Sequence, residues 1–170
     1  AQLINTADSI DDFLSIHRRL VRWDIELELN SMAELLQMQR READHAFARF
    51  VKRNYESWIQ SRLLPTNRPN NDTAPLMSPD IMKTRVLPLL DKGERVCLFV
   101  IDNFRYDQWK FVQPLISEWF NVEDDNLYMS ILPTATQYAR NAIFSGLMPL
   151  QIQEMFPDLW IAAPSLSRTA

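Results

Sequence analysis

The chain has 170 residues, of which 46% are hydrophobic and 24% charged, and its net charge is −4 at pH 7. This composition excludes an intrinsically disordered chain, and the scattered basic residues exclude strong whole-molecule attraction to nucleic acid. One cysteine excludes an internal disulfide framework, and two glycines exclude a Walker loop or a Rossmann fingerprint.

Residues 1–64 are predicted to form the antiparallel helices of a helical bundle, since apolar side chains recur there at helical spacing. Ser31 followed by Glu34 is a capping box, which predicts a break and a second helix from about Met32 to Arg62. Because the connection is short, the two helices are expected to lie side by side and antiparallel.

Two shorter segments follow these helices. Turn-forming residues over 65–78 mark a linker. Ser78 before Pro79 is a typical helix start, so we expect residues 79–91 to form the third helix of the bundle.

The second half, residues 95–170, has the pattern of an α/β sheet. Six consecutive apolar residues, 96–101, are typical of a strand buried on both faces, and residues 127–132 predict another strand. Helical periodicity follows over 106–120 and over 136–145. The order strand, helix, strand, helix predicts an α/β fold after the N-terminal helical bundle.

Two residue positions follow the predicted strands, at the edge where open α/β sheets bind ligands. Asp102 comes directly after the first strand, so its carboxylate either ligates a divalent cation or caps the next helix. A hydroxyl in Pro133–Thr136 lies at the start of the later helix, where it is either a plain N-cap or a nucleophile toward phosphorus.

These motifs carry a family resemblance. The segment 100–107 resembles the metal-ligand strand of the alkaline phosphatase superfamily, in its PglZ branch. The stretch 133–137, with 146–149 after it, is similar to the nucleophile segment of that superfamily. The whole chain, helices included, is similar to the middle of PorX-type response regulators, two-component proteins of bacteria with type IX secretion.

The resemblance implies roles for two residues. Asp102 falls on the first metal ligand, and Thr136, rather than Thr134, falls on the nucleophile. In a complete site, Thr136 would attack a phosphodiester or phosphomonoester in line, assisted by two zinc ions. The implied substrates are nucleotides or oligonucleotides.

Three more residues are candidates for substrate binding. Arg140 and Asn141 lie about one turn beyond the implied nucleophile. Arg105 either contacts an anion or forms a structural salt bridge to Asp107 or Asp102.

The resemblance also implies a truncated alkaline-phosphatase-like sheet over 95–170, since the family completes its zinc sites with aspartates and histidines absent here. We therefore expect a fragment of a response regulator that controls type IX secretion. Its effector domain would be a zinc-dependent phosphodiesterase, and the fragment alone would be inactive and would not retain zinc.

The resemblance implies a sensor kinase and a protein of the secretion machinery as partners. An exposed sheet edge favours a homodimer, and exchange of helices between the two chains is one way to form it. No apolar run is long enough for a membrane span, so we expect a cytoplasmic protein without membrane insertion. The competing hypothesis is a helical signalling or dimerisation module that binds a protein partner without catalysis.

Overall fold

The computed structural model describes residues 2–27, 33–63 and 74–160. The chain divides into two compact units, one formed by residues 1–75 and 101–127, the other by residues 76–100 and 128–170. The predicted capping box at Ser31 and most of the predicted linker over 65–78 lie outside the described residues.

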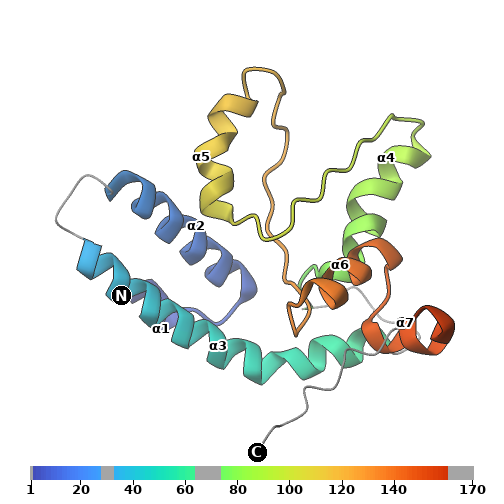
Figure 1. Cartoon of the computed structure of the whole chain (residues 1–170). Coiled ribbons are helices and arrows are strands. Elements are labelled where there is room, and N and C mark those ends of the chain that lie inside the picture. The colour runs from blue at the N-terminus through green and yellow to red at the C-terminus, as the bar shows by residue number, and fades with distance from the viewer. Residues whose placement is uncertain (1, 28–32, 64–73, 161–170) are drawn as a thin grey trace, which may run out of the picture. The chain divides into compact units, whose positions relative to one another are not determined.

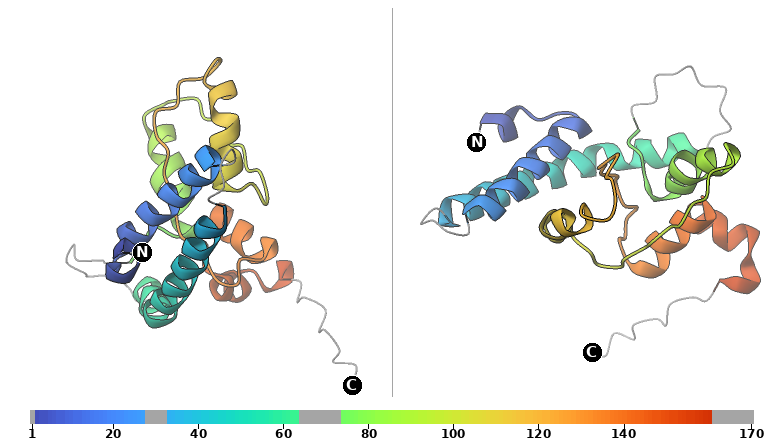
Figure 2. Two further views of the ribbon diagram at one scale, coloured as in Figure 1. Left: turned by 90° about the vertical axis from the view of Figure 1, so that its left-hand side faces the viewer. Right: turned by 90° about the horizontal axis from the view of Figure 1, so that it is seen from above.

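The first unit is helical. Its elements are α1 (Gln2–Thr6), α2 (Ile10–Leu27), α3 (Ala33–Leu63) and α5 (Tyr106–Ile116). Helices α2 and α3 lie against each other and run in opposite directions (Figures 1 and 2). The prediction of a helical N-terminus is confirmed.

Aromatic side chains hold α2 against α3. The Phe13 ring on α2 is 5.3 Å from the ring of Phe47 and 4.9 Å from the ring of Phe50, both on α3. Phe50 in turn lies 5.7 Å from Trp58. Phe13, Phe50 and Trp58 are buried, so the apolar stripes read from the sequence form the core of this unit.

The second unit is built from short helical pieces. They are η1 (Ser78–Asp80), η2 (Met82–Val86), α4 (Leu87–Asp91), α6 (Thr136–Ser145), α7 (Pro149–Met155) and η3 (Pro157–Leu159). Residues 79–91 are thus almost entirely helical, as predicted, although η2 is a turn of π-helix. Their packing into a three-helix bundle stays a prediction.

The core of the second unit centres on Met77, Ser78 and Ile131, which are fully buried. The Ile131 backbone N–H donates to Ser78 Oγ at 3.2 Å, and the Met129 N–H donates to the Leu76 carbonyl at 2.9 Å. These hydrogen bonds pair buried backbone groups that are not part of a β-sheet.

The predicted α/β fold is wrong, because the described residues contain no strand and no sheet. Residues 127–132 make one isolated parallel bridge, between Met129 and Met77. Residues 96–101 are irregular, and Phe99 and Ile101 expose 83% and 64% of their surface. Cys97, within the same segment, is also exposed.

The error has a physical reason. A run of apolar residues favours burial of its side chains, but it does not identify the segment that would accept and donate the backbone hydrogen bonds of a strand. Within 74–160 and the other described ranges, no extended neighbour lies along residues 96–101. The separate finding on membranes is that no helix in these ranges is long and apolar enough to cross a bilayer.

Candidate functional site

Asp102 lies in a turn directly before α5, in the first unit. Its side chain is exposed, and Asn103 after it has a φ of 55°, a left-handed conformation that asparagine tolerates well. The Arg105 N–H donates to Gln108 Oε1 at 2.9 Å, which fixes the start of the helix. Asp102 is thus presented on a short, ordered turn outside α5.

Arg105 is held by Asp107. The guanidinium donates to the Asp107 carboxylate at 2.8 and 3.0 Å, and this hydrogen bond raises the pKa of Arg105 and lowers that of Asp107. Of the two alternatives for Arg105, the structure therefore contains the salt bridge to Asp107. A role of Arg105 toward substrate stays a prediction.

Thr136 is the first residue of α6, in the second unit, and its side chain is half-buried. The Ala135 carbonyl accepts the N–H groups of Tyr138 and Ala139 at 2.9 and 3.0 Å, so the helix begins immediately before Thr136. The backbone N–H groups of this first turn are the positive end of the helix dipole, which favours an anion.

The two other candidates on α6 are exposed. Arg140 follows Thr136 by four residues, so both lie on one face of the helix, whereas Asn141 lies further around it. Arg140 is therefore the better placed of the two to contact an anion held near Thr136.

Asp102 and Thr136 belong to different units, so their meeting in one pocket stays a prediction. The described residues contain no group of three or more His, Cys, Asp or Glu side chains that fits a metal ion. The described residues therefore do not by themselves supply the ligands of the zinc pair that the resemblance implies.

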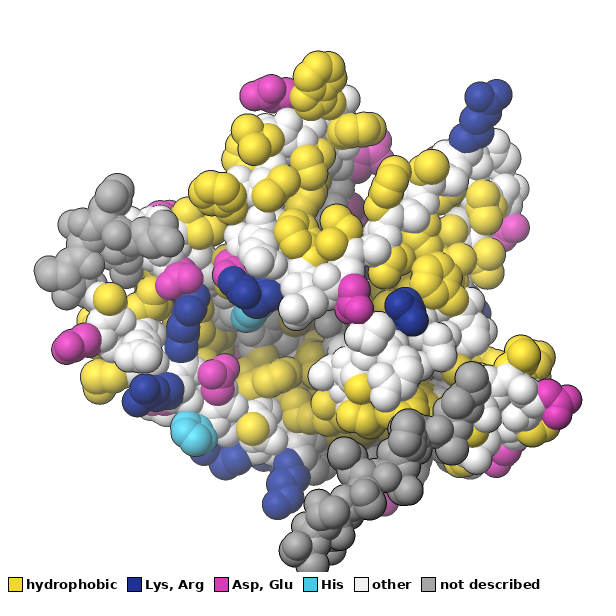
Figure 3. Space-filling view, in the orientation of Figure 1, with side chains coloured by type: hydrophobic (Ala, Val, Ile, Leu, Met, Phe, Trp, Pro, Cys, Tyr) yellow, Lys and Arg dark blue, Asp and Glu magenta, His cyan; other side chains and the backbone are white. Residues whose placement is uncertain are grey.

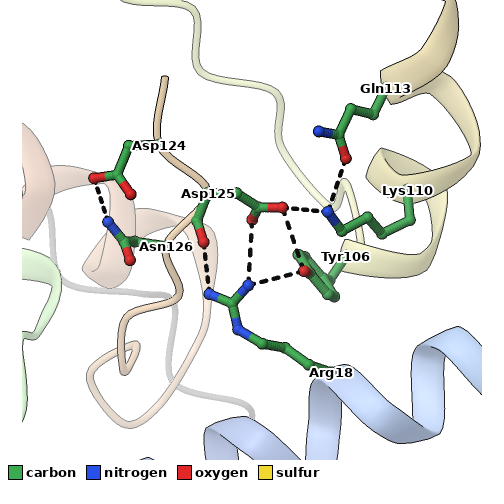
Figure 4. Close-up of polar contacts among 7 residues, drawn as sticks. All are labelled: Arg18, Tyr106, Lys110, Gln113, Asp124, Asp125 and Asn126. Carbon is green, nitrogen blue, oxygen red and sulfur yellow. Dashed lines mark hydrogen bonds and ion pairs between the residues drawn. The ribbon is translucent and has the colours of Figure 1, made fainter. Parts of the chain in front are cut away.

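The first unit also contains a polar cluster that sequence reasoning missed, here called the Asp125 cluster: Arg18 on α2, Tyr106 and Lys110 on α5, and Asp125 (Figure 4). Arg18 donates to Tyr106 Oη at 3.1 Å and to the Asp125 carbonyl at 2.6 Å. Tyr106 Oη donates to Asp125 Oδ2 at 3.3 Å, and Lys110 Nζ donates to the same oxygen.

The cluster is arranged so that Asp125 is ionised. Burial by itself raises the pKa of Asp125, but the hydrogen bond from Lys110 and the charges of Lys110 and Arg18 outweigh it and lower the pKa. The same hydrogen bond raises the pKa of Lys110. Both cations also lie against the Tyr106 ring, at 5.6 Å for Arg18 and 5.3 Å for Lys110.

Asp125→Asn is expected to lower the free energy of unfolding by about 1–2 kcal/mol at pH 7, because hydrogen bonds to a charged group are lost. Since the folded pKa of Asp125 is lowered, its contribution is complete above the unfolded value of 3.8 and is lost as pH falls through the folded value. Urea unfolding of both proteins from pH 7 to pH 3 measures this. A difference that grows on acidification would contradict the assignment.

No local sequence motif predicts the Asp125 cluster. Arg18 and Asp125 are 107 residues apart in the sequence, and each by itself looks like an ordinary surface charge. The one available signal is Lys110, a charge among the apolar positions of the α5 segment.

Comparison with known families gives two matches. Residues 81–170 match the family described as the BREX system PglZ alkaline phosphatase-like domain. Residues 1–59 match the PorX response regulator linker domain. No curated protein matches the chain.

Proposed function

This chain belongs to the PglZ alkaline phosphatase-like family, and from that membership we propose that it is part of a response regulator whose effector domain hydrolyses phosphoesters. The observation that carries the proposal is the order of the two matches, with a PorX linker domain directly before the PglZ segment. The proposed setting is the cytoplasm, in a two-component system that controls type IX secretion, with a sensor kinase and a secretion-machinery protein as partners.

In this proposal Thr136 is the nucleophile. Its Oγ1 forms a bond to the phosphorus of a nucleotide-like phosphodiester while the bond to the leaving alkoxide breaks, and the hydroxyl proton passes to that alkoxide. Water then hydrolyses the phosphothreonine. In this proposal the N–H groups at the start of α6 and Arg140, four residues after Thr136, bind the phosphoryl oxygens.

Asp102 is proposed as a ligand of a zinc site that needs further ligands. These 170 residues alone are proposed to be inactive, since Asp102 is the one metal ligand that the resemblance assigns among them. The test is therefore hydrolysis of a chromogenic phosphodiester by the complete gene product in zinc-containing buffer, with Thr136→Ala as the critical variant. Turnover that survives this substitution would remove the assignment.

A second candidate function, a helical dimerisation module without catalysis, is favoured by one observation. Hydrophobic side chains gather on the surface over α5 and the residues after it (Figure 3). Phe111, Leu115 and Trp119 expose 73%, 60% and 82% of their surface. Contiguous apolar surface of this kind marks an interaction site more often than a free surface.

If this second function holds, the chain is a dimer and Trp119→Glu shifts it to the monomer, because a charge replaces an apolar contact. Light scattering over a range of concentrations measures the mass. The control is Leu3→Glu, at another exposed apolar position, which should leave the dimer intact. A monomer at every concentration would count against the module.

A further inference from the structure

Helix α5 is attached to the rest of its unit without any fully buried side chain of its own. Several of its apolar side chains face solvent. Apolar burial is what normally fixes a helix of this length, since a helix of 11 residues is marginal by itself. The contacts between α5 and α2 include the hydrogen bond from Arg18 to Tyr106 Oη and the rings of His17 and Tyr106, which are 5.9 Å apart.

The Asp125 cluster joins three parts of the chain at one carboxylate. Arg18 comes from α2, Lys110 and Tyr106 from α5, and Asp125 from the segment that returns after α5 (Figure 4). Arg18 lies in the part that matches the PorX linker domain, whereas the other three lie in the part that matches PglZ. The cluster thus spans the two family segments.

The side chains of the Asp125 cluster are shielded from solvent well enough for their polar contacts to contribute to stability. The side chains of Asp125 and Lys110 are 19% and 30% exposed. By contrast, the Arg22–Glu26 pair on the same helix α2 is 73% and 59% exposed, and pairs of that kind contribute little. Arg18 is 37% exposed, so water weakens its share, but it donates to both Tyr106 and the Asp125 backbone.

The position of α5 gives the cluster a consequence beyond stability. Tyr106 is the first residue of α5, four residues after Asp102, and the turn between them is anchored by Arg105 and Gln108. A displacement of α2 that breaks the Arg18 contacts therefore releases the start of α5 and the turn before it.

We propose that the Asp125 cluster is a polar clamp that couples the linker-domain helix α2 to α5 and the turn before it, both in the PglZ segment, so that movement of one is transmitted to the other. The clamp rests on the contacts and the two family matches. It does not depend on phosphoester hydrolysis, and its test uses no activity.

The test is amide hydrogen exchange of the 170-residue chain, read in peptides that cover residues 101–116 and 10–27. Arg18→Gln, a change on α2, is expected to speed exchange in 101–116 by about threefold to tenfold, because that segment loses its attachment. Asp125→Asn is expected to speed exchange in 10–27 as well as in α5. The matched control is Arg22→Gln, one turn further along α2, which should change 101–116 by less than about twofold.

The double variant separates a clamp from independent surface contacts. If Arg18 and Asp125 act through one cluster, Arg18→Gln with Asp125→Asn exchanges no faster in 101–116 than the faster single variant. Additive effects, an effect of Arg18→Gln confined to α2, or an equal effect of Arg22→Gln would each overturn the proposal.

Tyr106→Phe keeps the test decisive if a charge substitution unfolds the chain. This variant keeps the ring between Arg18 and Lys110 but removes the hydroxyl that accepts from Arg18 and donates to Asp125. We expect exchange in 101–116 to rise about twofold to fivefold with unchanged helical circular dichroism. No change in exchange would overturn the clamp.

Discussion

Thr136→Ala is expected to lower hydrolysis of a chromogenic phosphodiester by the complete gene product by about 1,000-fold or more, with little change in KM. Alanine has no oxygen to attack phosphorus, and loss of a nucleophile removes an interaction made only on the way to the transition state. The N-cap residue of α6 is Ala135, and its carbonyl accepts the first N–H groups of the helix. The substitution at Thr136 leaves these hydrogen bonds in place. Turnover under saturating substrate measures the effect.

Thr134→Ala is the matched control, since it removes the same atoms two residues earlier, at an exposed position outside α6. Its turnover is expected to stay within about threefold of the unmodified protein. Thr136→Ser keeps the hydroxyl and should retain measurable turnover and a phosphoryl group on the peptide that contains residue 136. If Thr134→Ala were inactive and Thr136→Ala kept its activity, the nucleophile would be Thr134 and the proposed assignment to Thr136 would be wrong.

The helices of this chain could be predicted because their signals are local. The helix predicted over 136–145 is α6, and Gly146 ends it with a φ of 68°, a conformation that glycine adopts without strain. The long helix predicted from about Met32 to Arg62 is found as α3. In each case the spacing of apolar residues and a residue at the end carry the information.

The prediction of a sheet failed because strand pairing is not a local property of the sequence. Residues 96–101 have the composition of a buried strand, yet a strand exists only where another segment accepts its hydrogen bonds. The Asp125 cluster has the opposite difficulty: its residues look ordinary in sequence and acquire meaning only when α2 and α5 come together. The candidate site is intermediate, since the helix of Thr136 is confirmed while the approach of Asp102 to it stays a prediction.

Phe13→Ala is expected to lower the free energy of unfolding by about 3–5 kcal/mol, the usual cost of removing a buried phenylalanine. Phe13 is 5% exposed and lies between α2 and α3, against the rings of Phe47 and Phe50. Alanine does not fill the space of the phenylalanine ring, so the cost includes a cavity as well as lost transfer free energy. Urea unfolding followed by circular dichroism at pH 7 measures it.

Two comparisons show whether that loss comes from the packing of α2 on α3. Phe13→Leu keeps most of the apolar volume, so it should recover more than half of the loss. Leu35→Ala removes an apolar side chain from α3 that is 51% exposed, and its effect should stay below about 1 kcal/mol. Since α2 also carries Arg18, a chain weakened at Phe13 should show faster amide exchange in α5 as well, which links the apolar core of the linker helices to the polar clamp that they support. Equal losses in Phe13→Ala and Leu35→Ala would mean that the two helices are not held by this aromatic core.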